Sequence, residues 1–496
     1  MAYKKSIILT SKKFKGKELK EMARRISQGN LNVTNSAELL SYVINQTPIL
    51  RENLDLPVQG EDINPIGKLI MKNAAYKNAF LNTVNLIGLT VITRNHWENP
   101  WKTFTDKGEL TYGQQVREII TDIANVYDYN TLVDRPQDFI KTEVPNVLNY
   151  LHEVNYQKFY KTTTSDEQMA MAFERNDLFS LIDEIVNSLY EGMEYDNYQV
   201  AKYVLARRIL EGTVTAIQIP NLDNLTDREV VSFIKGYSDD MTFRSNKFNP
   251  AGIRKATAFD DQFAIVSTKF DGKFTTNVLA TSYFRSDAEM KAHMELCDGF
   301  GNFDNARLAE VFAKRDANGD VIANEYVDGY EPITANESAY LNNIPCVIVG
   351  RDFFQMYRYG LDARAEGGRA TMFFNPQTLR STHWLHYWGV MSSSPFEQAI
   401  CFTKEAQGVT SVTVSPSTAT VTKGQTLELT AVVVTTGFAN KAVYWSVDST
   451  AYADGVRISD GGKLIVPSGA TATSITVTAT SIYDNTVSGT ATITVA

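Results

Sequence analysis

The chain has 496 residues, of which 43% are hydrophobic and 21% are charged, and its 48 basic and 57 acidic residues give a formal charge of −9. These proportions are typical of a folded globular protein and exclude a disordered, collagen-like or coiled-coil chain. The length predicts about three domains, large enough to fold without disulfide bridges or structural metal ions.

Neither a membrane span nor an export signal is expected. No apolar run approaches the roughly 18 residues of a transmembrane helix, so we expect no membrane partner. The basic start of the chain precedes an apolar run of only three residues, against the ~7–15 of a signal peptide. The cysteines are odd in number and far apart, which predicts unpaired, buried thiols in a reducing compartment: Cys297, Cys346 and Cys401.

The first 25 residues form a basic segment that contains nine Lys or Arg and two Glu, ahead of an acidic remainder. Such a segment can neutralise phosphates, because each contact with nucleic acid releases condensed counterions. The alternative is a solvated arm that lies across an acidic neighbouring subunit. The residues proposed to face a packaged genome or a scaffold are Lys12, Lys13, Lys15, Lys17, Arg24 and Arg25.

Residues 86–92 form a short apolar run that predicts a strand. The polar stretch that follows, residues 99–130, contains aromatic side chains but has weak periodicity. It predicts an extended excursion with too little apolar surface to form a core of its own. We therefore expect it to become ordered against a neighbouring subunit.

A long helix is the strongest periodic signal in the chain. Ser165 is a candidate N-cap, with Gln168 at the spacing of a capping box. Beyond Asn176, apolar residues recur every three or four positions. The pattern predicts a helix over residues 177–211, about 50 Å long and with room for a bend at Gly192.

The remaining central segments are predicted to be mainly strands. Residues 263–274 predict a strand and a turn, residues 342–359 one continuous apolar strand, and residues 384–402 a pair of strands. Continuous apolar runs are typical of strands buried on both faces. The central region is therefore expected to be α+β, a sheet with helices against it.

The composition changes near residue 408. Residues 409–496 are rich in Thr, Ser and Val and alternate in short runs separated by Gly, Pro and Asn. This pattern predicts about seven strands in a small all-β sandwich, with Trp445 in its core.

Motifs of catalysis or metal binding are weak, so we expect no enzyme, no cofactor and no metal. Asp316 begins like a calcium loop, but Val321 stands where glycine is required, and a hairpin turn at Asn318-Gly319 explains the segment better. His383 and His386 have a helical metal-ligand spacing, yet their aromatic neighbours favour a packed strand with structural histidines.

Two parts of the chain resemble known families. The tail resembles the bacterial Ig-like group 2 module (BIG2), through VTSVTVSPSTATVTKGQTLELTAVV, VYWSVDS, GGKLIV and TVTATS. The first 408 residues resemble the major capsid proteins of phi29-like short-tailed phages, which have the HK97-like fold. The matching blocks are LIGLTVI (86–92), NPWKTF (99–104), REIITDI (117–123), VPNVLNYLHEVNYQKFY (144–160), FDDQFAIVSTKFDGKF (259–274) and HYWGVMSSSPFEQAICF (386–402).

The resemblance implies a division of the chain into the parts of a capsid subunit. These parts are an N-terminal arm and leading segment (1–94), an E-loop (95–144), a peripheral domain with a spine helix (145–212), an axial domain (213–370) with an insertion near 303–340, return strands of the peripheral domain (371–408) and the Ig-like module (409–496).

It also implies a function and partners. We expect a major capsid protein that forms pentamers and hexamers of an icosahedral or prolate head around double-stranded DNA. It would be assembled in the bacterial cytoplasm with scaffolding, portal and other head proteins. Trp101 and Phe104 are expected to anchor a neighbouring subunit, or alternatively to pack within their own. Lys102, Lys107 and Tyr112 are further expected contacts of the E-loop.

Other functions stay open from sequence alone. The tail is also compatible with a cell-surface adhesin or S-layer protein, although no second copy of the module is present. A glycosidase needs only two facing carboxylates, which carry no local signature. The module itself is a candidate for contact with host glycans or for reinforcement of the shell.

Overall fold

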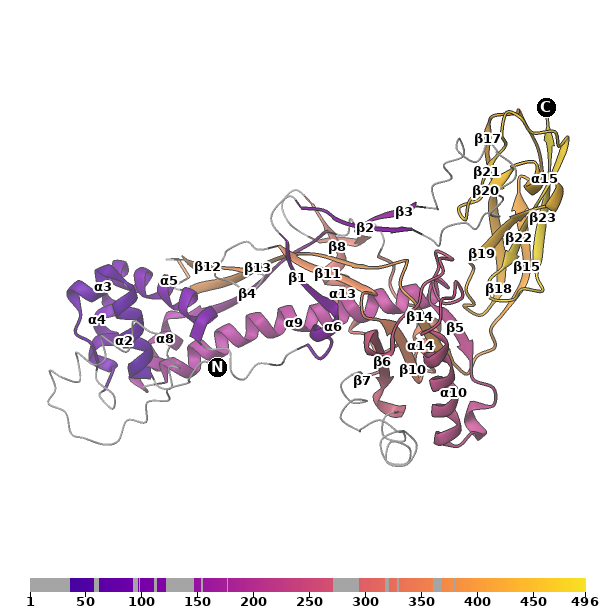
Figure 1. Cartoon of the computed structure of the whole chain (residues 1–496). Coiled ribbons are helices and arrows are strands. Elements are labelled where there is room, and N and C mark those ends of the chain that lie inside the picture. The colour runs from indigo at the N-terminus through magenta and orange to yellow at the C-terminus, as the bar shows by residue number, and fades with distance from the viewer. Residues whose placement is uncertain are drawn as a thin grey trace, which may run out of the picture.

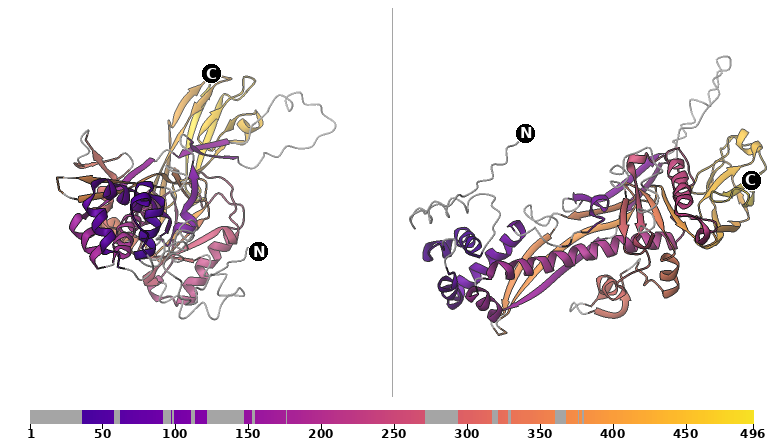
Figure 2. Two further views of the ribbon diagram at one scale, coloured as in Figure 1. Left: turned by 90° about the vertical axis from the view of Figure 1, so that its left-hand side faces the viewer. Right: turned by 90° about the horizontal axis from the view of Figure 1, so that it is seen from below.

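The computed structural model describes residues 36–57, 62–91, 97, 99–110, 114–121, 147–152, 155–175, 177–270, 294–316, 321–327, 330–359, 368–375, 377–378 and 380–496. The molecule is elongated, with a group of helices at one end, two sheets in the middle and an all-β module at the other end (Figures 1 and 2). None of the described helices is both long enough and apolar enough to span a membrane.

The helices at the first end form a small core of their own. They are α2 (Ser36–Gln46), α3 (Pro48–Asn53), α4 (Asn64–Lys72), α5 (Ala74–Val91) and α8 (Asp166–Glu174). Leu39 and Ile44 of α2 pack there with Phe80 and Phe173. The strand predicted at residues 86–92 is wrong, because residues 86–91 end α5, and residue 92 lies outside the described residues. A short apolar run does not by itself distinguish a strand from a buried turn of helix.

The long helix predicted from periodicity is confirmed as α9 (Leu178–Leu210), and it continues without interruption through Gly192. Ser165 caps α8 in the predicted capping box with Gln168. The apolar stripe of α9 serves two cores. Its first turns pack among the N-terminal helices and its later turns pack against the central sheets.

The first sheet lies along α9 (Figure 1). Its strands are β1 (Asp106–Leu110), β11 (Phe354–Tyr359), β13 (Arg380–Ser393) and β12 (Gly368–Asn375) in that order, with β4 (Asn155–Ser165) also paired to β13. The histidines of β13 lie on a strand, as predicted. Burial alternates along β13, so His383 is buried while His386 is only partly buried. Burial lowers the pKa of His383 to about 4, which keeps this ring neutral.

The second sheet has the strand order β5 (Thr215–Gln218), β14 (Ala399–Thr403), β10 (Cys346–Gly350), β6 (Gln262–Ser267) and β7 (Met294–Cys297). Every residue of β10 and β14 is buried, as the continuous apolar runs predicted. Helix α10 (Asp227–Asp240) places Val230 and Ile234 in the core on one face of this sheet. Residues 342–359 form two strands of different sheets rather than one, because the chain turns at residues 351–353.

The three cysteines are free and buried, as predicted. In the register of β10 and β14, Cys401 lies opposite Val347, so Cys346 points to the other face of the sheet. The two thiols therefore lie in different cores and face away from each other. Burial raises the pKa of Cys346 to about 12 and that of Cys297 to about 11, which leaves both as unreactive thiols.

The expected insertion near residues 303–340 folds as α13 (Asn305–Phe312), β8 (Ala313–Arg315), β9 (Val321–Tyr326) and α14 (Ala335–Leu341). Strands β8 and β9 pair antiparallel. The turn predicted at Asn318-Gly319 lies between them, outside the described residues.

Trp101 and Phe104 lie inside the central core, around the short helix α6 (Lys102–Thr105). The fully buried indole of Trp101 donates a hydrogen bond to the carbonyl of Leu296 at 3.0 Å. The ring of Phe104 stacks on Phe263 with the centroids 5.2 Å apart. The prediction that these two rings anchor a neighbouring subunit is therefore wrong, because they have almost no accessible surface in their own subunit. The alternative, packing within the subunit, is confirmed.

Residues 408–496 form nine strands in three small sheets. The strands are β15 (Gly408–Ser415), β16 (Thr418–Val421), β17 (Thr426–Glu428), β18 (Thr430–Thr436), β19 (Val443–Val447), β20 (Arg457–Ile458), β21 (Lys463–Ile465), β22 (Ser474–Ser481) and β23 (Ser488–Val495), with helix α15 (Ser449–Ala453) after β19. This all-β unit, called the module below, has a core of its own that includes Trp445, as predicted.

We expect Trp101→Ala to destabilise the soluble subunit by about 3–5 kcal/mol, because it deletes a buried ring and leaves an unfilled cavity. Trp97→Ala is the matched control, since Trp97 belongs to the same segment and is partly exposed. Its loss should stay near 1 kcal/mol. Denaturant unfolding measures both changes, and equal losses would contradict the placement of Trp101 in the core.

The module supports a second comparison on one strand. Trp445 is 5% exposed and its neighbour Tyr444 is 47% exposed. We expect Trp445→Ala to cost about 3–5 kcal/mol and Tyr444→Ala to cost about 0.5 kcal/mol or less. Thermal unfolding of the full chain, followed by circular dichroism, tests this difference. If Tyr444→Ala proves the more damaging change, the assignment of the core is wrong.

Candidate functional site

A two-stranded hairpin stands apart from both central sheets. Strand β2 (Val116–Thr121) pairs antiparallel with β3 (Val147–His152), from Val116 opposite His152 to Thr121 opposite Val147. Within the described residues, neither strand pairs with any other. A hairpin of two strands is marginally stable by itself in water. Its exposed side chains include Ile119, which is 62% exposed.

The root of the hairpin is fixed to the body by buried polar and aromatic contacts. The Nδ1 atom of His152 lies 2.9 Å from Oγ of Ser392 in β13, while its Nε2 atom lies 3.4 Å from the carboxylate of Glu118 within the hairpin. Tyr150 packs edge-on against Phe396, with the centroids 6.4 Å apart. These contacts define the direction in which the hairpin leaves the subunit. No sequence motif indicates them, since Ser392 and Phe396 lie more than 200 residues from the hairpin in the chain.

Lys102 and Lys107, which were predicted to contact a neighbouring subunit, form ion pairs within their own subunit. Lys102 forms an ion pair with Glu194 of α9 at 3.2 Å. The ammonium of Lys107 donates to the Asp352 carboxylate at 2.9 Å and to the carbonyl of Arg351 at 2.6 Å. Tyr112 and the basic residues chosen from the first 25 lie outside the described residues. Contact of these side chains with another subunit therefore stays a prediction.

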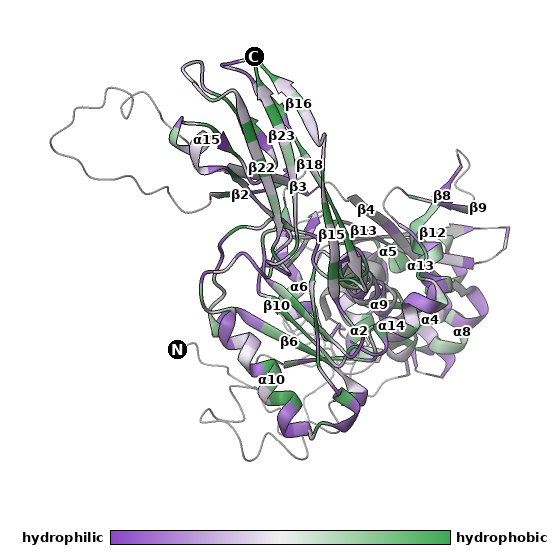
Figure 3. Ribbon diagram, turned by 90° about the vertical axis from the view of Figure 1, so that its right-hand side faces the viewer, coloured by the Kyte–Doolittle hydropathy of each residue, from purple (hydrophilic) through white to green (hydrophobic). Residues whose placement is uncertain are grey.

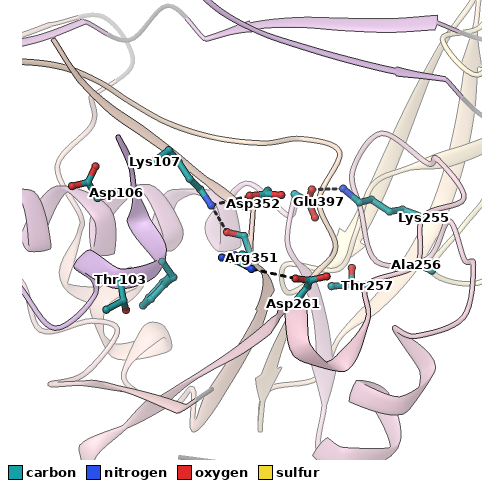
Figure 4. Close-up of a pocket in the computed structure, with 11 residues that line it drawn as sticks. Thr103, Asp106, Lys107, Lys255, Ala256, Thr257, Asp261, Arg351, Asp352 and Glu397 are labelled. Atoms are coloured by element: carbon teal, nitrogen blue, oxygen red, sulfur yellow. Dashed lines mark hydrogen bonds and ion pairs between the residues drawn. The ribbon is translucent and has the colours of Figure 1, made fainter. Parts of the chain in front are cut away.

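A charged cleft of about 560 Å³ lies beside the hairpin root (Figure 4). Its wall combines α6 and the start of β1 with the segment before β6, the turn between β10 and β11, and the turn between β13 and β14. Three pairs of opposite charge line it: Lys107 with Asp352, Lys255 with Glu397, and Arg351 with Asp261.

Burial and the cation partners have opposite effects on the pKa values of the carboxyls in the cleft. Burial raises the pKa of Glu397, although the ammonium of Lys255 opposes that shift. Partial burial also opposes ionisation of Asp352, but the hydrogen bond and charge of Lys107 lower the pKa of this carboxyl below its usual range. Because each carboxylate in the three pairs has a cation partner, the cleft resembles a structural ion-pair network more than an acid–base pair.

Helix α9 carries charged residues within its buried stripe. Asp196 is three residues after Met193 and four before Val200, so it lies on the apolar face. Its carboxylate accepts two hydrogen bonds from Arg307 of α13, at 2.8 and 3.0 Å. The ammonium of Lys202, also buried, donates to Asp298 at 2.8 Å. These pairs were not predicted from the sequence, although a charge inside an apolar stripe is a signal that could have revealed them.

The described residues contain no group of three or more His, Cys, Asp or Glu side chains placed to hold a metal ion. The features that stand out are therefore the projecting hairpin of β2 and β3, helix α9 with its ion pairs, and the separate module. Such features are typical of subunits that contact one another.

Known proteins that resemble this chain are subunits of this kind. The family model of the Phi29-like phage major capsid protein matches residues 53–403. The major capsid protein of Bacillus phage B103 is 25% identical over 460 residues, which cover 91% of each chain. That of Bacillus phage GA-1 is 24% identical over 432 residues, covering 85% of this chain and 81% of the relative.

Solved capsids are similar at lower identity. The capsid structure of Staphylococcus phage Andhra matches 64% of this chain and 87% of its own, with 14% identity and a TM-score of 0.48. The family matched by sequence is one of structural capsid proteins rather than enzymes. Because its model spans most of the chain, the protein belongs to the phi29-like phage major capsid proteins and is a component of the virion shell.

Proposed function

We propose that this capsid protein is an HK97-like subunit whose copies overlap as tiles in a closed head. On this proposal α9 is the spine helix, and strands β4 and β13 belong with it to the peripheral domain, residues 145–212 and 371–408. Strands β5, β6, β7 and β10 belong to the axial domain, residues 213–370, around the centre of a capsomer. The segment near 303–340 is an insertion in that domain. The supporting observation is the single long helix shared by two cores.

The hairpin of β2 and β3 carries the assignment of an E-loop. Within residues 95–144, the described residues 99–110 pack against the body, and β2 is the strand that leaves it. A fixed root with an unpaired hairpin beyond it suits a surface that is completed by a second copy. Burying an exposed isoleucine such as Ile119 contributes about 1.5–3 kcal/mol.

The proposed head consists of pentamers and hexamers, icosahedral or prolate, around double-stranded DNA. We propose that it assembles in the bacterial cytoplasm with scaffolding, portal and other head proteins. The basic first 25 residues favour a position facing the genome or a scaffold, because an excess of Lys and Arg attracts polyphosphate. On this proposal the module is Ig-like and lies on the outer face, where its Thr-rich and Ser-rich surface needs no partner for solubility.

We expect Ile119→Arg to weaken the contact between the hairpin and a neighbouring subunit by about 1.4 kcal/mol. This loss corresponds to a yield of closed shells about tenfold lower. The charge would be buried without a partner when a neighbour covers the hairpin. Val321→Arg is the matched control, since Val321 is an exposed residue of a different two-stranded hairpin. Sedimentation and negative-stain microscopy measure the yield. Equal yields for the two variants would contradict the role of the hairpin.

Replacing the six chosen basic residues, Lys12, Lys13, Lys15, Lys17, Arg24 and Arg25, by Gln tests the N-terminal segment. If it faces DNA, retention of packaged DNA should become less dependent on salt, because fewer counterions are released. Filled heads incubated across a range of NaCl concentrations provide the measurement. Replacing the lysines of the module is the control. Unchanged DNA retention with weaker shells would favour an arm that connects subunits instead.

A further inference from the structure

Strand β18 (Thr430–Thr436) is an open edge of the module. It pairs antiparallel with β15 on one side and with no strand on the other, and all residues of the module are described. Figure 3 shows β15 and β18 running together along one side of the module. The backbone groups on the free side of such a strand are a template for another strand.

The side chains on the outer face of this edge are apolar. Val432 is 59% exposed and Val434 is 49% exposed, while Val433 between them is buried in the core of the module. Their partners across the ladder are Thr413 and Ser411 of β15. Exposed valines at alternate positions make a narrow apolar strip along an edge that also offers free hydrogen-bonding groups.

Two of the features that protect edges in other proteins, charged side chains and proline, are absent from β15 and β18, although the ladder between them has an irregularity between Val409 and Ser411. Edge strands are usually blunted by charged side chains or proline. Neither strand contains either, whereas each strand of the sheet formed by β17, β21 and β20 carries a charge: Glu428, Lys463 and Arg457. The two strands β15 and β18 therefore carry no charged side chain, whereas every strand of the sheet formed by β17, β21 and β20 does.

The sequence of β18, TAVVVTT, is nearly symmetric about Val433. If a second copy of the strand lies antiparallel to it about that residue, Val432 faces Val434 of the second copy. Thr430 then faces Thr436, and β-branched or small residues meet at every position. A symmetric pair of this kind is isologous, the commonest arrangement between identical subunits.

We propose that β18 pairs edge to edge with β18 of a second copy of this chain, antiparallel about Val433. The self-association of capsid proteins brings copies together, and the symmetric strand suits a second copy better than an unrelated one. This goes beyond the proposed function, which gives the module no partner. The added strand pairing would join two modules across the boundary between neighbouring subunits.

Disulfide trapping in assembled shells of the full chain tests the register. Opposite residues of an antiparallel pair have Cα atoms about 4.5–5.5 Å apart, within disulfide reach, whereas diagonal residues are roughly 7–8 Å apart. The variant V432C/V434C should therefore form dimers on oxidation. The single variants V432C and V434C should each form about tenfold less, because their like cysteines are diagonal. Co-assembly of the two single variants should restore the dimer.

The native cysteines give a low background, because all three are buried and free. Y444C/S446C is the matched control, with the same spacing on the outward side of β19 in the other sheet. No dimer from V432C/V434C, or equal dimer from the control, overturns the proposal. Strong dimer from either single variant overturns the register. Absence of shells for the unmodified chain would instead contradict the proposed function.

A second variant keeps the proposal testable without oxidation. V432K/V434K places two charges on each edge and should lower the temperature at which shells release subunits, while Y444K leaves that temperature unchanged. Equal release temperatures for V432K/V434K and the unmodified chain would overturn the proposal. Loss of glycan binding with unchanged shell stability would indicate an adhesive role for this edge, and would equally overturn it.

Discussion

The ion pairs made by three buried charges of α9 determine how the parts of this subunit are held together. Glu194, Asp196 and Lys202 lie within about two and a half turns of one helix and bind Lys102, Arg307 and Asp298, respectively. Each partner comes from a different segment: helix α6 ahead of the hairpin, helix α13 and the residue after β7. Glu194, Asp196 and Lys202 are themselves buried, so removing a partner leaves a buried charge without compensation. Because each partner is a third or more exposed, the cost stays below the about 3–5 kcal/mol of a fully buried pair. The helix therefore fixes three segments relative to one another.

The parts that could be predicted from sequence are those whose residues repeat with a period. The 33 residues of α9 show the helical period over many turns, and the module shows strict alternation with turn residues between strands. Both predictions needed only local chemistry. The strands β10 and β14 were recognisable because burial on both faces leaves a continuous apolar run.

The rest depended on contacts between distant segments. Residues 86–92 are apolar without a decisive period, and residues 86–91 are helical as the continuation of α5. Trp101 is a large aromatic residue in a polar stretch, which is typical of an interface anchor. Its partners Leu296 and Tyr198 are far away in the chain, and they bury it. The hairpin root likewise joins His152 to Ser392, a pairing that no local pattern indicates.

Electron cryomicroscopy of particles formed by the full chain tests the overlap of neighbouring subunits most directly, since it shows what the hairpin of β2 and β3 touches. We predict a closed shell in which Ile119 is covered by an adjacent subunit while Trp101 stays inside its own. A reconstruction in which the hairpin contacts no second copy, in particles that nonetheless close, would contradict this arrangement.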